Sequence, residues 1–148
     1  SGAYEVCLQA IQPSATIVTK PCPLFVPFVE EGLTESAMTD MVISHYLSEV
    51  KEQQIDTLLL GCTHYPMMHQ AIERYMGDSV ACIDPAANAA YLLKQKLQEL
   101  DLLNELTGEQ QPEYRFYASD NAPKLLDFAQ QILPQLIQNI IKIDIEDF

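Results

Sequence analysis

Three side chains that can exchange protons stand next to one another at the end of a short apolar run. Cys62, Thr63 and His64 supply a thiol, a hydroxyl and an imidazole, and they follow Gly61 and the run Leu58–Leu60. A thiol beside an imidazole can act as a nucleophile or as an acid/base pair, since the histidine can take or lend a proton. The spacing of these residues therefore indicates a site of proton transfer or of nucleophilic chemistry.

The surrounding residues predict how the chain presents these side chains. Residues 55–60 predict a buried strand, Gly61 permits a sharp turn, and Pro66 suits the first turn of a helix over residues 67–76. Cys62, Thr63 and His64 would then lie at the carboxyl end of a strand, where open α/β sheets bind their ligands.

Each of these residues also has a purely structural interpretation. Cys62 could be an ordinary buried cysteine, Thr63 could cap the following helix, and His64 could bond a carbonyl. If functional, Cys62 gains from backbone N–H groups and a helix dipole, both of which favour the thiolate.

Three reaction classes use a cysteine with a histidine. Thiol acyl transfer needs the histidine as base and an oxyanion hole. A cysteine phosphatase would need an arginine shortly after the thiol, and none occurs before Arg74, so we discard that class. In the third class, proton abstraction next to a carboxylate, the thiol acts as a base, and inversion requires a second acid on the opposite face.

Strands and helices are predicted to alternate along the rest of the chain. Helices are expected over residues 1–12, 34–53, 85–100 and 119–133, strands over 16–19, 79–83, 114–118 and 140–145, and loops over 22–32 and 101–112. In the helix over 34–53, Thr34 or Ser36 can cap the start and Met38, Met41, Val42, Tyr46 and Val50 form the apolar stripe. Such alternation predicts an α/β fold with a mostly parallel sheet and flanking helices.

Composition excludes several classes of partner. The 148 residues are 48% hydrophobic and carry a net charge of −13, which repels nucleic acid and anionic membranes. We find neither a membrane-spanning run nor a signal-like start, so the expected location is the cytoplasm, where the four cysteines would be reduced. A zinc site would need distant residues such as Cys22, Cys62 and His64, and the local ligand pairs of zinc sites are missing, so no metal is expected.

The residues around Cys62 resemble a known family. The run over residues 60–66, Leu-Gly-Cys-Thr-His-Tyr-Pro, is similar to the second cysteine motif of glutamate racemases in the aspartate/glutamate racemase superfamily. Residues 22–32 resemble that family's Cys-Pro-x-Phe-x-Pro-x-Val-Glu segment. Met76-Gly77 with Ile83-Asp84, and Arg115-Phe116-Tyr117, resemble later family segments, so the similarity covers essentially the whole chain.

The resemblance implies a reaction and roles for particular residues. Family members interconvert L- and D-glutamate without a cofactor, using two cysteines on opposite sides of the substrate Cα. By resemblance Cys62 is one of the two, Thr63 and His64 contact substrate, His64 assists Cys62, and Glu30 supports the acid/base chemistry. Glu31 takes the place of Glu30 if the register slips by one. D-glutamate supply for peptidoglycan is the implied pathway.

The resemblance also implies that half of the site lies elsewhere. The family's first catalytic cysteine, in a Cys-Asn-Thr context, has no counterpart here, and Cys7, Cys22 and Cys82 are expected to be packing residues. We therefore expect a carboxy-terminal fragment that cannot racemise alone, with residues 1–84 forming most of the second lobe and 85–148 returning to the first. Open sheet edges predict a homo-oligomer, in the form of a dimer.

Two other functions remain open at this point. A non-catalytic binding or interaction domain could keep the fold and lose the reaction. A sister racemase could act on aspartate or another amino acid, because side-chain selectivity depends partly on the missing half.

Overall fold

The computed structural model describes residues 2–104 and 113–147. The chain forms two compact units, Ser1–Leu93 and Lys94–Phe148, and the division falls inside helix α5 (Pro85–Glu99).

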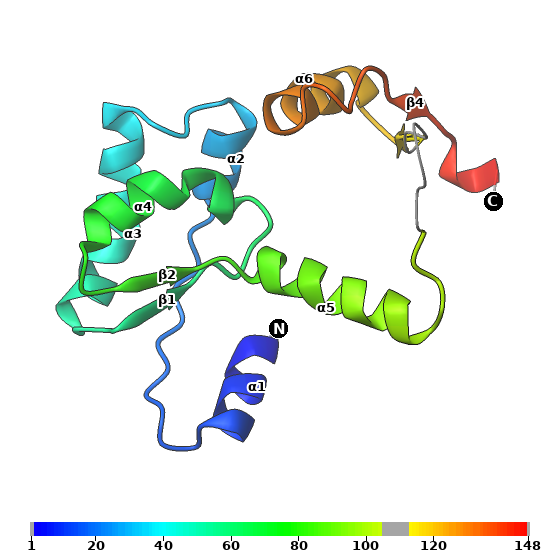
Figure 1. Cartoon of the computed structure of the whole chain (residues 1–148). Coiled ribbons are helices and arrows are strands. Elements are labelled where there is room, and N and C mark those ends of the chain that lie inside the picture. The colour runs from blue at the N-terminus through cyan, green and yellow to red at the C-terminus, as the bar shows by residue number, and fades with distance from the viewer. Residues whose placement is uncertain (1, 105–112, 148) are drawn as a thin grey trace. The chain divides into compact units, whose positions relative to one another are not determined.

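A parallel pair of strands forms the centre of the first unit. Strand β1 (Thr57–Leu59) pairs with β2 (Ala81–Ile83) in the register Thr57↔Ala81, Leu58↔Cys82 and Leu59↔Ile83. Figure 1 shows α3 (Ala37–Glu52) and α4 (His69–Met76) on one side of this pair and α1 (Ala3–Ile11) on the other. Helix α2 (Phe25–Glu30) and the 3₁₀ turn η1 (Tyr65–Met68) complete the unit.

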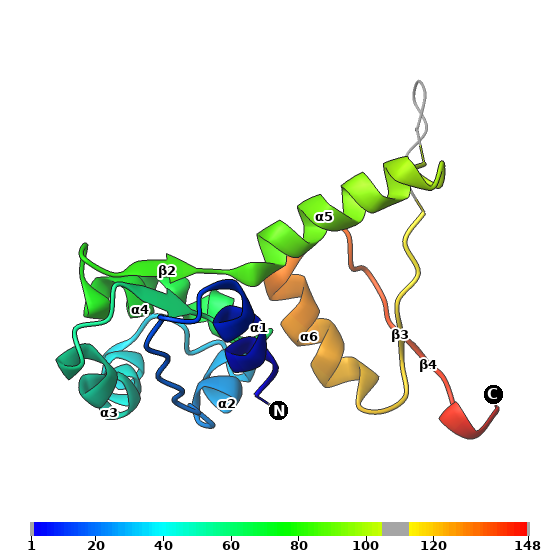
Figure 2. The same cartoon turned by 90° about the horizontal axis from the view of Figure 1, so that it is seen from below.

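The core of the first unit lies where α2, α3 and α4 pack together, an arrangement that Figure 2 shows from below. Its fully buried side chains are Phe25, Val29, Thr39, Ile43, Met68 and Ile72. Thr39 is the polar member, and its hydroxyl donates to the carbonyl of Leu33 at 3.0 Å, so burial leaves it satisfied. This packing confirms an α/β layer of helices on a parallel pair.

Three predicted helix ends are confirmed in atomic detail. Ser36 caps α3, with its hydroxyl accepting from the Thr39 N–H at 3.1 Å, so Ser36 rather than Thr34 is the cap. Gly77 ends α4 at a φ of 88°, a conformation that glycine adopts without strain. Asp84 begins α5, accepting from the Ala86 N–H at 2.9 Å ahead of Pro85.

Three expectations for the first unit are wrong. Residues 16–19 form no strand, because β-branched residues become a strand only against a pairing partner, and in the described chain β1 pairs with β2 alone. Residues 25–30 of the predicted loop form α2, since Pro27 occupies the third helical position, where the N–H would have no intrahelical partner. In the predicted stripe of α3, Met38 and Met41 are exposed, and Thr39, Ile43 and Leu47 are buried beside Val42 and Val50.

The second unit holds a second short parallel pair. Strand β3 (Tyr117–Ala118) pairs with β4 (Ile141–Lys142), and the Ile143 N–H continues the ladder to the Ala118 carbonyl at 2.9 Å. Helix α6 (Ala122–Ile132) lies between them in sequence, and η2 (Ile145–Asp147) follows. The predicted alternation is confirmed, with shorter strands than expected. The predicted loop over residues 101–112 lies largely outside the described residues.

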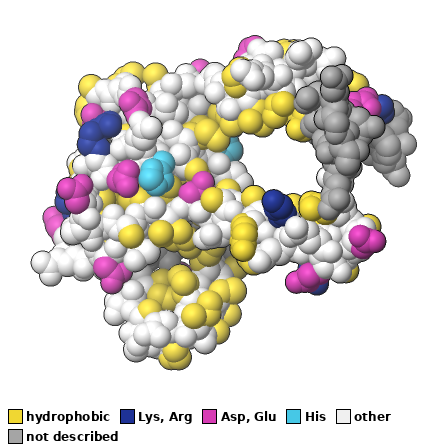
Figure 3. All heavy atoms as spheres, viewed as in Figure 1, with side chains coloured by type: hydrophobic (Ala, Val, Ile, Leu, Met, Phe, Trp, Pro, Cys, Tyr) yellow, Lys and Arg dark blue, Asp and Glu magenta, His cyan; other side chains and the backbone are white. Residues whose placement is uncertain are grey.

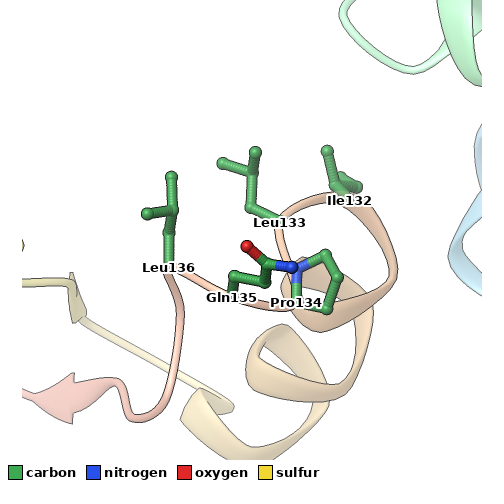
Figure 4. Close-up of a pocket in the computed structure, with 5 residues that line it drawn as sticks. All are labelled: Ile132, Leu133, Pro134, Gln135 and Leu136. Atoms are coloured by element: carbon green, nitrogen blue, oxygen red, sulfur yellow. The ribbon is translucent and has the colours of Figure 1, made fainter.

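An open hollow in the second unit follows α6. It is lined by Ile132, Leu133, Pro134, Gln135 and Leu136, and in Figure 4 the side chains of Ile132, Leu133 and Leu136 point to the same side. It contains no titratable side chain, and the residues predicted to be catalytic belong to the other unit. We therefore assign it no chemistry.

Helices α1 and α5 bury none of their described side chains. Val6 and Ile11 of α1 are 70% and 79% exposed, and Figure 3 shows this helix covered with apolar side chains. Neither helix, nor any other in the described parts of the chain, combines the length and apolar character needed to cross a bilayer.

The cap of α3 makes a prediction about stability. Replacing Ser36 by alanine leaves the buried Thr39 region with an unsatisfied N–H, so Ser36→Ala should lower the free energy of unfolding by about 1 kcal/mol. Urea denaturation followed by circular dichroism measures this loss. Thr34→Ala is the matched control and should cost much less, and equal losses in the two variants would show that Ser36 is not the cap.

Candidate active site

The turn predicted to present Cys62, Thr63 and His64, called the corner below, forms directly at the end of the parallel ladder. The Leu60 N–H donates to the Ile83 carbonyl at 2.9 Å, and Leu60 is 2% exposed. At the next residue the chain turns, with the Gly61 N–H bonded to the Leu59 carbonyl at 3.0 Å. The prediction of a buried strand is wrong for most of residues 55–60, because Leu60 alone among them is buried against the core. The last hydrogen bond of the ladder still fixes where Cys62 begins.

Gly61 lies close to a neighbouring ring, and its backbone φ is outside the left-handed region. A Cβ at this position would lie 3.2 Å from Cε2 of Tyr4, closer than carbon atoms ordinarily pack. The ring of Tyr4, from α1, thus lies directly against the backbone that delivers Cys62. The sequence predicted a turn at Gly61 but gave no sign of Tyr4.

The corner leads into a 3₁₀ turn before an α-helix starts. The Tyr65 N–H donates to the Cys62 carbonyl at 3.2 Å, and Pro66 stands in the first turn of η1, as predicted. The α-helix itself begins only at His69. The α-helix therefore begins later than the predicted residue 67, and η1 separates its N-terminus from Cys62.

The three predicted side chains share this corner with different exposure. Cys62 and His64 are half-buried, and Thr63 is exposed. Thr63 does not cap η1, whose first residues receive no side-chain cap. Its hydroxyl lies 3.4 Å from Nδ1 of His64, so the hydroxyl and the imidazole orient one another.

Glu30 joins the corner from a distant part of the sequence. It is the last residue of α2, and its Oε1 lies 3.6 Å from Nε2 of His64, slightly beyond direct hydrogen-bond distance. A carboxylate here favours an imidazole that carries its proton on Nε2, leaving Nδ1 toward Thr63 as an acceptor. The structure thus brings Glu30 to His64 and Thr63, and Cys62 adjoins Thr63 in the sequence.

The other cysteines lie in different environments. Cys22 is buried, and burial raises the pKa of its thiol to about 11 despite the nearby Lys20. Cys82 is half-buried in β2, and burial together with the Glu73 carboxylate raises its pKa. Cys7 is exposed on α1, so its predicted packing role is wrong within the described residues.

Tyr65 is the residue at this site that sequence reasoning did not select. Its hydroxyl donates to the Cys22 carbonyl at 3.1 Å and accepts from the Cys22 N–H at 3.2 Å. No local pattern reveals this contact, since 43 positions separate the two residues. In the described chain, no group of three or more His, Cys, Asp or Glu side chains is arranged to hold a metal ion.

Fold and corner together define an α/β protein with a thiol and an imidazole at the end of a parallel strand, backed by a carboxylate. Comparison with curated proteins finds a glutamate racemase from Thermoanaerobacter sp. (strain X514) that is 38% identical over 149 residues, covering 100% of this chain and 55% of that protein. Glutamate racemase 2 from Caldanaerobacter subterraneus is 34% identical, again over 100% of this chain and 55% of the relative. No family model matches.

Solved structures agree with the sequence relatives. A glutamate racemase from Francisella tularensis in complex with D-glutamate superposes with a TM-score of 0.87 and 33% identity, over 99% of this chain and 54% of that one. A glutamate racemase isoform from Bacillus anthracis superposes with a TM-score of 0.85 and 27% identity, over 96% of this chain and 52% of that one. Over its whole length the chain is therefore similar to glutamate racemases, and it matches the second half of these relatives. It spans about half the length of the curated relatives it matches.

The environment of Cys22 predicts a difference in thiol reactivity. At about pH 8 iodoacetamide should modify half-buried Cys62 well before Cys22, because the raised pKa alone lowers the thiolate fraction of Cys22 about 100-fold. Mass spectrometry of the digested chain measures both rates. In urea the two rates should converge, and equal rates in the folded chain would contradict the buried, protonated state of Cys22.

Proposed function

We propose that this chain supplies one face of a glutamate racemase site. The observation that carries the proposal is the corner itself: within a family-wide match, Cys62, Thr63 and His64 lie at one strand end with Glu30 3.6 Å from His64. The Francisella relative was solved with D-glutamate, which supports glutamate as the substrate.

The proposed reaction is a transfer of one proton at the amino-acid Cα. In one direction the Cys62 thiolate removes the Cα proton, and the electron pair is held by the adjacent carboxylate as charge builds up there. An acid on the opposite face then returns a proton to Cα with inverted configuration. In the other direction Cys62 is the acid that donates.

The neighbouring side chains assist this step in the proposal. His64 assists proton exchange at Cys62, and Glu30 holds the imidazole in the required tautomer. Thr63 and His64 provide donors to substrate from the exposed side of the corner. No step requires a cofactor or a metal.

We place the opposite acid in a polypeptide that corresponds to the first half of the relatives. The exposed apolar side chains of α1 and α5 are consistent with a further polypeptide covering these helices. In this proposal residues 1–84 form most of one lobe and residues 85–148 return to the other. The protein that unites this chain with such a first half is called the joined protein below.

The proposed setting follows from the reaction. D-glutamate would supply peptidoglycan synthesis, and the four free cysteines are consistent with a reducing cytoplasm. We further propose that a second copy of the chain pairs with it as a dimer, since each strand of the described residues has a single pairing partner. A strictly monomeric particle in sedimentation of concentrated protein would contradict the dimer.

The proposed role of Cys62 predicts the kinetics of one substitution. In the joined protein, Cys62→Ser should lower kcat/KM by at least about 100-fold and equally in both directions, because Cys62 is the base in one direction and the acid in the other, and the two enantiomers have equal free energy. Circular dichroism of D- and L-glutamate measures both directions. The 148-residue chain alone should show no turnover.

Cys7→Ser is the matched control, because Cys7 is exposed on α1 and lies outside the proposed chemistry. It should leave the rate unchanged. Full activity of the Cys62→Ser variant, or robust turnover by the chain alone, would overturn the proposed function.

A further inference from the structure

One side-chain hydroxyl satisfies both backbone groups of a single distant residue. The Tyr65 hydroxyl donates to the Cys22 carbonyl and accepts from the Cys22 N–H, at 3.1 and 3.2 Å. Burial raises the pKa of Tyr65, so its hydroxyl stays protonated and able to donate at neutral pH. The contact joins the residue after His64 to the segment that precedes α2.

The segment around Cys22 depends on this hydroxyl for its hydrogen bonds. Because Pro21 and Pro23 have no N–H, Cys22 carries the single backbone donor of residues 21–23. Cys22 is 2% exposed, and a buried N–H without a partner costs about 1–3 kcal/mol. Since these residues form no strand, Tyr65 takes the place that a neighbouring strand would have filled.

The same carbonyl also starts helix α2. The Phe25 N–H donates to the Cys22 carbonyl at 3.0 Å, and the Phe25 ring packs edge-on against Tyr65 with centroids 5.2 Å apart. Tyr65 thus holds the first turn of α2 through a hydrogen bond and through ring packing.

The other end of α2 carries Glu30. The helix has six residues and spans about 9 Å, so it transmits the position of its first turn to its last residue. Glu30 faces His64, which directly precedes Tyr65 in sequence. Two adjacent residues of the corner therefore contact the two ends of one short helix.

We propose that Tyr65 is a positioning residue whose hydroxyl fixes α2 on the corner and thereby places Glu30 against His64. Tyr65 itself exchanges no proton with substrate. The consequence for catalysis rests on the proposed racemase function, whereas the effect on the Glu30–His64 pair does not.

Tyr46 provides a matched control for the ring. Like Tyr65, it packs edge-on against the ring of Phe25, with ring centroids 5.6 Å apart. Its hydroxyl forms no hydrogen bond within residues 2–104 and 113–147. Tyr46→Phe therefore removes a hydroxyl from the same aromatic cluster without removing a contact to Cys22.

The first measurement uses the 148-residue chain and tests the hydrogen bonds. In Tyr65→Phe, the Cys22 amide should exchange with solvent deuterium about 10-fold faster or more, because its buried acceptor is gone. The Ile43 amide in α3 should be unchanged, and Tyr46→Phe should match the original chain. Unchanged exchange at Cys22 in Tyr65→Phe would overturn the proposal.

The second measurement tests whether the hydroxyl places Glu30. Glu30→Gln should shift the nuclear magnetic resonance signal of the His64 ring at fixed pH, because it removes the nearby carboxylate charge. In the Tyr65→Phe background the same substitution should shift it by less than half as much. An equal shift in both backgrounds would show that Glu30 is placed without Tyr65.

The third measurement extends the test to catalysis in the joined protein. Tyr65→Phe should lower kcat about 10-fold with little change in KM, and it should add nothing in the Glu30→Gln background. If the two substitutions instead lowered kcat independently, so that the double variant lost the product of the two factors, the positioning role would be overturned. A joined protein without any racemase activity would refute the proposed function alone, since the first two measurements need no turnover.

Discussion

The hydrogen bond from Leu60 to Ile83 ends a parallel ladder, and the geometry of the corner depends on where that ladder stops. The Leu60 N–H is the last backbone group of this segment that bonds the partner strand, and from Gly61 onward the chain turns and presents side chains. The ring of Tyr4 lies so close to the turn that a Cβ at Gly61 would crowd it. A thiol delivered by so constrained a backbone has a fixed position, which proton transfer requires.

The imidazole next to this thiol is held from two directions. Thr63 faces one ring nitrogen of His64 and Glu30 faces the other, and Glu30 arrives on a helix that starts beside Tyr65. The carboxylate of Glu30 therefore lies beside the imidazole although the two residues are far apart in the sequence. An oriented histidine beside a half-buried cysteine suits acid/base chemistry, whereas the deeply buried Cys22, with its raised pKa, serves packing.

The parts of this arrangement that sequence could predict are those with a local cause. An apolar run, a glycine and a proline sufficed for the strand, the turn and the start of η1, and Ser36, Gly77 and Asp84 marked helix ends through their own side chains or backbone freedom. The placement of Glu30 near His64 was expected from family resemblance, not from spacing.

The parts that failed depend on distant partners. Residues 16–19 have strand-like composition but no strand to pair with, and Pro27 looked incompatible with a helix until its place in the first turn was known. The exposure of Met41 and the double bond from Tyr65 to Cys22 likewise follow from packing between segments far apart in sequence. Local sequence patterns do not predict contacts between such distant segments.

The central claim is that the corner at Cys62 exchanges a proton at the Cα of glutamate with the help of an acid on the opposite face. The most direct measurement follows the joined protein in deuterium oxide and determines the isotope at Cα of the newly formed enantiomer. We expect the inverted product to carry solvent deuterium from the first turnovers, while unreacted substrate keeps its hydrogen. An inverted product that retains the hydrogen of the substrate would contradict it.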